Sequence, residues 1–145
     1  MQNSNYFRIA EHDIRIVFND SDVNSLALID SFLPFKTKRP DGELLFQLTV
    51  DDSLQPVPKE HRHRIRAFDS GNGDTIVDRL DNGGYQYIIK DVYGGCCCLL
   101  IADKEFCNCR CALNGTFAMR DYGLNSALML IMAFAGSRKQ TLLVH

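Results

Sequence analysis

All six cysteines of this 145-residue chain lie in the segment "CCCLLIADKEFCNCRC", residues 96–111. Thiols bind zinc, form disulfides, carry redox chemistry or fill a hydrophobic core, and their spacing helps to separate these roles. Structural zinc sites prefer two cysteines separated by a short loop. Alternate residues of a strand carry their sulfurs about 6–7 Å apart, too far to share one zinc ion. The segment also lacks the C-x-x-C motif of redox proteins. Its spacing therefore favours strands whose cysteines pack in a core.

The turn signals that flank the cysteines assign them to faces of an antiparallel sheet. We expect two-residue hairpin turns at Asn82-Gly83, Gly94-Gly95 and Asp103-Lys104, the first of which pairs Leu80 with Tyr85. Side chains alternate along a strand, and directly paired residues share a face. This register therefore collects apolar residues on one face and a mixture on the other. The predicted core cysteines, all on the apolar face, are Cys96, Cys98, Cys107, Cys109 and Cys111.

The same register leaves other roles for the thiols open. It places Cys98 opposite Cys109 and Cys96 opposite Cys111, and facing pairs of this kind also suit disulfides. Cytoplasmic proteins rarely keep disulfides, however. A three-residue turn at residues 103–105 would move Cys96 and Cys98 to the opposite face from the later cysteines. A small zinc protein stays an alternative that rests on the thiols alone.

The remaining patterns predict the elements around this sheet. A chain of this length is expected to form a single domain, residues 1–145. Helical spacing of apolar residues predicts a short helix near residues 22–33, and an apolar segment predicts a strand at residues 42–50. Residues 122–136 read as a second helix and residues 140–145 as a last strand. The expected fold is α+β, an antiparallel sheet of about six to eight strands with the C-terminal helix packed on it and a shorter N-terminal helix.

Composition excludes several classes of partner. The formal net charge is −2, from 16 basic and 18 acidic residues, which gives no electrostatic reason to expect nucleic acid or a membrane surface as a partner. The longest apolar run, residues 127–135, is shorter than the ~20 residues that span a bilayer, and the first residues do not resemble a signal peptide. We therefore expect a cytoplasmic protein. No P-loop, G-x-S-x-G or H-E-x-x-H motif occurs, so the residues indicate no catalytic, cofactor-binding or metal-binding set.

The predicted C-terminal helix is apolar on all sides. Leu124, Leu128 and Ile131 belong to one stripe, and methionines and a leucine fill the other sides. A helix of this kind is buried all round, whereas one sheet face covers only one side of it. We expect a second cover from another part of the chain, a second copy or another domain. The interface candidates are Met129, Leu130 and Met132 of the helix, and Leu142, Leu143 and Val144 of the predicted last strand.

Residues 126–145, "SALMLIMAFAGSRKQTLLVH", resemble the segment just before the nucleotide-binding domain of HPr kinase-like proteins, whose P-loop domain is phosphoenolpyruvate-carboxykinase-like. "SFLPFKT" (residues 31–37), "ELLFQLTV" (residues 43–50) and "DNGGYQYII" (residues 81–89) are similar to the N-terminal half of those proteins. The resemblance implies that residues 1–145 are a non-catalytic N-terminal accessory domain.

In such a protein the kinase domain would follow residue 145 and would bring the P-loop, ATP and magnesium. The resemblance therefore places only His145 near a kinase active site, and it implies no cofactor in this chain. It also implies a domain for substrate recognition, regulation or assembly in a serine kinase. Its partners would be the P-loop kinase domain and a protein or peptide substrate. The alternative function is a stand-alone protein- or peptide-binding module, either monomeric or dimeric. The alternative to the kinase domain as a partner is self-association through residues 124–145.

Overall fold

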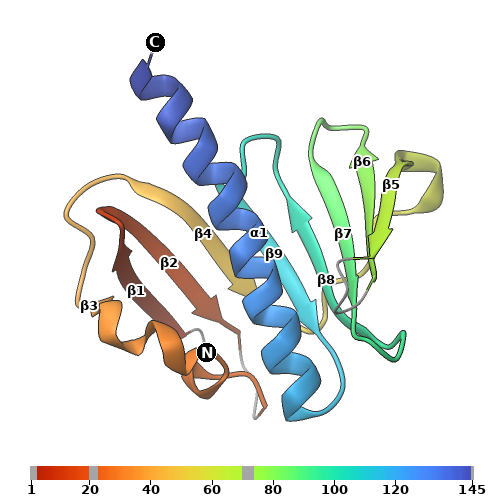
Figure 1. Cartoon of the computed structure of the whole chain (residues 1–145), viewed down its shortest axis with the longest axis horizontal. Coiled ribbons are helices and arrows are strands. Elements are labelled where there is room, and N and C mark those ends of the chain that lie inside the picture. Colours follow the sequence, from red (N-terminus) through yellow and green to blue (C-terminus); the bar gives the residue numbers. More distant parts are fainter. Residues whose placement is uncertain (1–2, 20–22, 70–73, 145) are drawn as a thin grey trace.

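The computed structural model describes residues 3–19, 23–69 and 74–144, and the side chains in these ranges except those of residues 3, 66, 68–69 and 138–144. The described residues form one nine-stranded mixed sheet with the strand order β3-β1-β2-β4-β9-β8-β7-β6-β5 (Figure 1). The strands are β1 (Asn3–Ile9), β2 (His12–Phe18), β3 (Lys36–Thr37), β4 (Leu44–Val50), β5 (Arg62–Asp69), β6 (Asp74–Leu80), β7 (Tyr85–Lys90), β8 (Cys96–Ala102) and β9 (Asn108–Leu113).

The expectation of a purely antiparallel sheet with fewer strands is wrong. Strand β4 pairs with β2 on one side and with β9 on the other, and both pairings are parallel. The apolar pattern within a strand reports which faces are buried but not the direction of its neighbours, so no local pattern indicated these pairings. The coarser assignment to the α+β class is correct, because the sheet carries one long helix, α1 (Phe117–Val144).

The predicted N-terminal α-helix at residues 22–33 is also wrong. The chain forms a 3-10 helix instead, η1 (Leu26–Phe35), which Ser25 caps by accepting a hydrogen bond from the Ala27 N–H. The backbone of Ile29 is not helical (φ −128°, ψ 45°), and Pro34 lies in the last turn. Proline removes a backbone donor, and 3-10 turns occur in short pieces, so η1 is a kinked segment and not a regular helix.

The turn at Asn82-Gly83 is one residue longer than predicted. Only Gly83 has a positive φ in this turn (+90°), whereas a two-residue type I′ turn requires positive φ at both central positions. Tyr85 consequently pairs with Arg79 and not with Leu80. A shift of one residue exchanges the two faces of a strand. The predicted pairing would place Asp78 on the same face as Tyr85, whereas the observed pairing places it on the opposite face, with Gln86.

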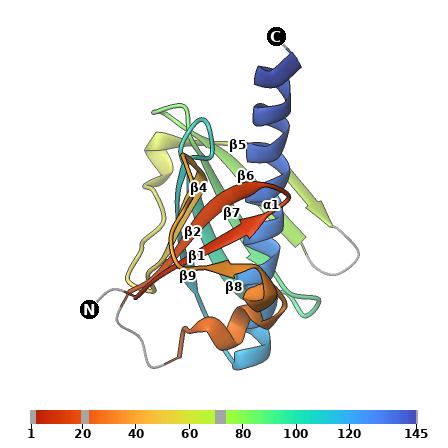
Figure 2. The same ribbon diagram turned by 90° about the vertical axis from the view of Figure 1, so that its left-hand side faces the viewer.

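Helix α1 continues through the predicted last strand. Residues 140–144 are helical, so the strand prediction is wrong there, and His145 lies outside the described residues. A short apolar run does not distinguish a buried strand from a helix. Figures 1 and 2 show that α1 crosses one face of the sheet with η1 beside it, and that its C-terminal turns extend beyond the sheet.

The inward stripe of α1 forms the centre of the core. Leu124, Ala127, Leu128, Ile131 and Ala135 are fully buried, and the helix contacts β4, β7, β8 and β9. Burial of a large apolar side chain stabilises the fold by about 1.5–3 kcal/mol. This stripe therefore fixes α1 on the sheet and leaves its other side facing outward.

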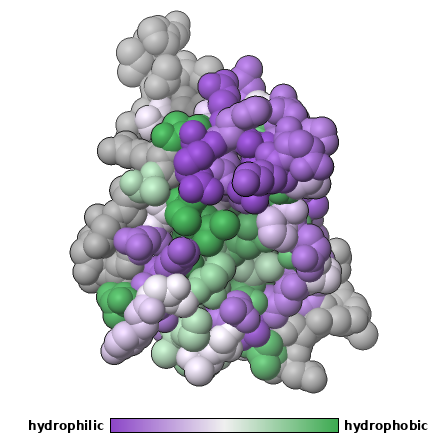
Figure 3. All heavy atoms as spheres, turned by 90° about the vertical axis from the view of Figure 1, so that its right-hand side faces the viewer, coloured by the Kyte–Doolittle hydropathy of each residue, from purple (hydrophilic) through white to green (hydrophobic). Residues whose placement is uncertain are grey.

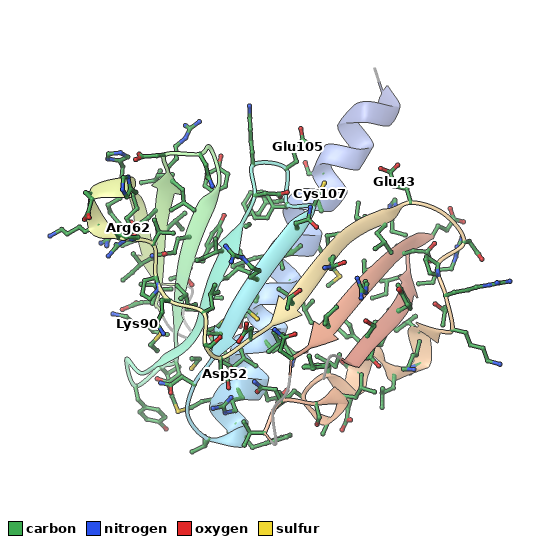
Figure 4. All side chains as sticks on the ribbon, turned by 180° about the vertical axis from the view of Figure 1, so that it is seen from behind. Glu43, Asp52, Arg62, Lys90, Glu105 and Cys107 are labelled. Carbon is green, nitrogen blue, oxygen red and sulfur yellow. The ribbon has the colours of Figure 1, made fainter. Side chains whose placement is uncertain are left out.

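The opposite face of the sheet is partly covered by residues 51–58, which cross it between β4 and the short 3-10 helix η2 (Lys59–His61) (Figure 4). Val57 holds this segment in place with both of its backbone groups. Its N–H donates to Gln86 Oε1 (2.8 Å), and its carbonyl accepts from Arg62 Nε (2.8 Å). Polar side chains of the sheet thus replace the backbone partners that a strand would supply.

We predict opposite effects from two glycine substitutions in α1. A Cβ at Gly123 would lie 2.9 Å from the carbonyl oxygen of Cys97 in β8, whereas a Cβ at Gly136 would meet nothing within 4 Å. Gly123→Ala should lower stability because α1 must move away from β8. Gly136→Ala, the matched control, should raise stability by about 0.5–1 kcal/mol. Urea unfolding at low protein concentration measures both, and equal effects would contradict the close approach at Gly123.

Candidate functional site

The structure places three of the five predicted core cysteines in the interior. Cys98 and Cys111 are 0% exposed, and Cys109 is 2% exposed. Cys107 is half-buried in the turn before β9, and Cys96 is exposed. The thiol segment is therefore divided between the core and the surface.

Cys96 is exposed because a bulge interrupts β8. Ile89 pairs with Cys98, but the next residue, Lys90, pairs with Cys96, so Cys97 is an extra residue on β8. Cys96 consequently lies on the opposite face from Cys98, which corrects its assignment to the core. Cys97, which the sequence placed on the mixed face, is itself fully buried.

The environment of Cys97 and Cys98 favours the protonated form of these two thiols. A hydrogen bond with Cys111, and then burial, raise the pKa of Cys98 well above its ordinary value. Burial also raises the pKa of Cys97. The thiolate is the form that binds metals and attacks disulfides, so neither chemistry is favoured here. All six cysteines are free thiols, and the described ranges contain no group of three or more His, Cys, Asp or Glu residues that could hold a metal ion.

We predict that iodoacetamide labels the native chain at Cys96 and Cys107 before the other cysteines. These two thiols are accessible to the reagent, whereas the other four are enclosed by α1 and the sheet. Mass spectrometry of peptides from native and guanidinium-unfolded samples measures the order of labelling. Labelling of Cys98 or Cys111 in the native protein as fast as that of Cys96 would contradict the burial of these thiols.

A groove of ≈ 930 Å³ runs over the outward side of α1, between η1 and the strands β6 and β7. Two interface candidates, Met129 and Leu130, line it, and Met129 is 68% exposed. The third, Met132, is partly buried against the core and does not line the groove. The lining residues are Ala27, Leu28, Asp30, Ser31, Thr75, Ile89, Phe117, Asp121, Tyr122, Asn125, Ser126, Met129, Leu130 and Ala133.

One side-chain amide of α1 joins the floor of the groove to its η1 wall. The side-chain amide of Asn125 donates to the Leu28 carbonyl (2.9 Å) and to Asp121 Oδ1 (2.7 Å). Leu28 and Ile29 are buried in the core, so η1 is held by apolar packing as well as by the amide. The groove is therefore part of the rigid fold.

The groove combines an apolar floor with negative charge. Asp30 of η1 and Asp121 of α1 line it, and no lysine or arginine of the described residues does so. Asp30 is exposed and Asp121 is half-buried. The surface therefore suits a partner with apolar side chains and positive charge.

Part of this site was accessible from the sequence. The all-round apolar character of α1 indicated an outward binding side, but no pattern indicated the η1 wall. The Asn125–Leu28 contact joins residues 97 positions apart, and no local spacing carries that information. The candidates Leu142, Leu143 and Val144 have no described side chains, so the structure does not place them in the site.

A separate polar cluster joins β5 to β6. Asp78 is 1% exposed and accepts hydrogen bonds from Arg62 Nη1 (2.8 Å) and Arg64 Nε (2.6 Å). Burial alone would raise the pKa of Asp78, but the hydrogen bonds from the two arginines outweigh it and hold the pKa below its ordinary value. The ionised aspartate thus holds two arginines of β5, which is one of the two edge strands of the sheet.

Two histidines share one carboxylate at the end of the same hairpin. His61 Nδ1 and His63 Nε2 lie 3.0 Å and 3.1 Å from the two carboxylate oxygens of Asp81. Hydrogen bonds with His61 and then with His63 lower the pKa of Asp81. All three side chains are at least half exposed, and Figure 3 shows the hydrophilic area on this side of the molecule, next to a hydrophobic area. The cluster is a solvated surface network.

We predict that Asp78→Asn destabilises the fold at neutral pH by about 2 kcal/mol, in the range for hydrogen bonds to a charged group. The folded-state pKa of Asp78 lies below the ordinary 3.8, so the ionised carboxylate stabilises the protein above that pH. This stabilisation is lost as the pH falls through the folded-state pKa. The difference between variant and wild type should therefore shrink in acid. Urea unfolding at neutral and acidic pH measures it, with Asp81→Asn as the exposed control. A difference that does not change with pH would contradict an ionised Asp78.

The comparisons with known proteins add no relative. No family model, no curated protein and no solved structure matches the chain significantly. Within the described ranges, none of the helices combines the length and the apolar character needed to cross a bilayer.

Proposed function

We propose that the chain is a non-catalytic accessory domain of an HPr kinase-like serine kinase, and that its groove binds a protein surface in substrate recognition, regulation or assembly. One observation carries this proposal: three of the four segments that resemble such proteins meet in the groove. Ser31 belongs to residues 31–37, Ile89 to residues 81–89, and several floor residues to 126–145. Segments far apart in the sequence thus build one surface.

The chemistry of this surface suits protein binding. Met129 is 68% exposed and Phe117 is 59% exposed, and exposed apolar groups beside a polar rim are typical of protein interfaces. Phosphoryl transfer requires a phosphate-binding loop, a lysine and magnesium-binding carboxylates. The sequence contains no P-loop motif, so ATP and magnesium are expected only in a separate kinase domain.

The shape of α1 supports a link to such a domain. The backbone of its last turns extends beyond the sheet (Figures 1 and 2), while its inward stripe is fixed in the core. The helix therefore reaches a neighbouring domain without leaving its own. The proposed contacts of Leu142, Leu143 and Val144 and the proposed position of His145 near an active site belong to this part of the chain.

We predict that a photo-crosslinking residue in the groove captures protein. The experiment replaces Met129 with p-benzoylphenylalanine in the source cells and identifies the adducts by mass spectrometry. We expect adducts with a P-loop kinase domain, with its protein substrate or with a second copy of the chain. The same residue at Glu43, which is exposed and outside the groove, is the matched control and should give none of them.

Calorimetry with magnesium-ATP provides the complementary measurement. A non-catalytic domain should give no binding heat with the nucleotide, because the chain has no phosphate-binding loop. Saturable binding of one ATP per chain would overturn the proposal. Adducts that do not differ between Met129 and Glu43 would overturn the assignment of the groove.

A further inference from the structure

The outward side of α1 carries a second periodic stripe. Tyr122, Ser126, Met129, Ala133 and Gly136, which we call the seam, follow one another at spacings of four, three, four and three residues. These are the spacings of contact positions in a pair of packed helices. All five positions are half-buried or exposed, and the first four line the groove. The seam is therefore separate from the stripe that packs on the sheet.

The seam is complementary to itself in the antiparallel direction. When Met129 lies opposite Met129 of a second copy, Tyr122 comes opposite Gly136, and Ser126 comes within one residue of the level of Ala133. The largest side chain thus meets the residue without one. A Cβ at Gly136 would have nothing within 4 Å, so this position offers space for the tyrosine ring. Large residues opposite small ones allow two helices to approach closely.

We propose that the seam is the interface of a two-fold symmetric homodimer, in which two α1 helices pack antiparallel with Met129 at the axis. Two-fold contacts use the same patch on both subunits, so one self-complementary surface is sufficient. This inference rests on the proposed function in one respect, since it names a second copy of the chain as the occupant of the same groove. In Figure 1 the described residues leave the outward side of α1 uncovered.

Charge along the helix agrees with the antiparallel direction. Asp121 lies near the N-terminal end of α1 and Asp30 lies across from it on η1, and both line the groove. The antiparallel pairing sets residue 137 of the second copy, a serine, opposite Asp121. A parallel pair would set Asp121 opposite Asp121, and like charges at this distance are unfavourable. The antiparallel dimer therefore combines size complementarity with the separation of the two Asp121 carboxylates.

The length of the seam sets the expected strength of the dimer. From Tyr122 to Gly136 the seam covers about 21 Å at a rise of about 1.5 Å per residue. One helix pair of this length, with contributions from the groove walls, is a small interface. We expect a reversible dimer with a dissociation constant on the order of micromolar.

Sedimentation velocity of the whole chain, over a concentration series through the micromolar range, tests the proposal. The wild type should change from monomer to dimer. Met129→Glu should remain monomeric because it places two like charges at the axis, and its exposed position spares the fold. Gly136→Leu should also remain monomeric although it improves helix propensity, so its melting temperature should rise. Val92→Glu, at a 61% exposed position outside the seam, should dimerise as the wild type does.

Disulfide trapping tests the antiparallel geometry. In a background with Cys96→Ser and Cys107→Ser, Met129→Cys should form a covalent dimer on mild oxidation, and Val92→Cys should not. A wild type that stays monomeric, a dimer that persists in both seam variants, or equal trapping at the two positions would overturn the dimer. If photo-adducts at Met129 then contained only a kinase domain or a substrate, the proposed function would stand without the dimer. If the dimer formed and the chain also bound ATP, the dimer would stand and the proposed function would be overturned.

Discussion

The parallel pairing of β4 with both of its neighbours is the constraint on which the rest of the structure depends. This strand joins the N-terminal hairpin β1–β2 to the C-terminal strands β5–β9 in one sheet. Phe46, Leu48 and Val50 of β4 are at most 1% exposed. A parallel neighbour requires a crossover connection, so the chain must leave β2 and cross back over the sheet before β4 begins. That crossover contains η1, which is why a wall of the groove lies beside α1.

The two faces of the sheet are covered by different means. Helix α1 covers one face with apolar side chains and approaches β8 so closely that only glycine fits at position 123. On the other face, residues 51–58 are held through Val57, whose N–H donates to the Gln86 side chain and whose carbonyl accepts from the Arg62 side chain. Because α1 uses one stripe for the sheet, Met129 and Leu130 are left on its outward side between η1 and β6. The groove is thus a consequence of covering a wide sheet with a single helix.

Local features were predictable from the sequence, and long-range features were not. The strand at residues 42–50 and the burial of Cys98, Cys109 and Cys111 follow from local alternation. The turn at Asn82-Gly83 was misjudged because positive φ was expected at both of these residues, whereas the non-glycine residues Ala10 and Glu11 both have it, with φ of 50° and 69°. Tertiary context determines such turns as much as residue type does. The parallel pairings of β4 and the η1 wall depend on residues far apart in the chain, so no local pattern reports them.

The two glycines of α1 show how the fold and the proposed interface are related. A glycine inside a helix costs about 0.5–1 kcal/mol relative to alanine, and a close contact that excludes a Cβ offsets this cost. Gly123 has one within the chain, because β8 occupies the space of its Cβ. At Gly136 an added Cβ would meet nothing within 4 Å, and this position stands at the spacing of the seam. The described residues thus give no close approach of this kind at Gly136, and in the proposed antiparallel dimer Tyr122 of the second copy provides it.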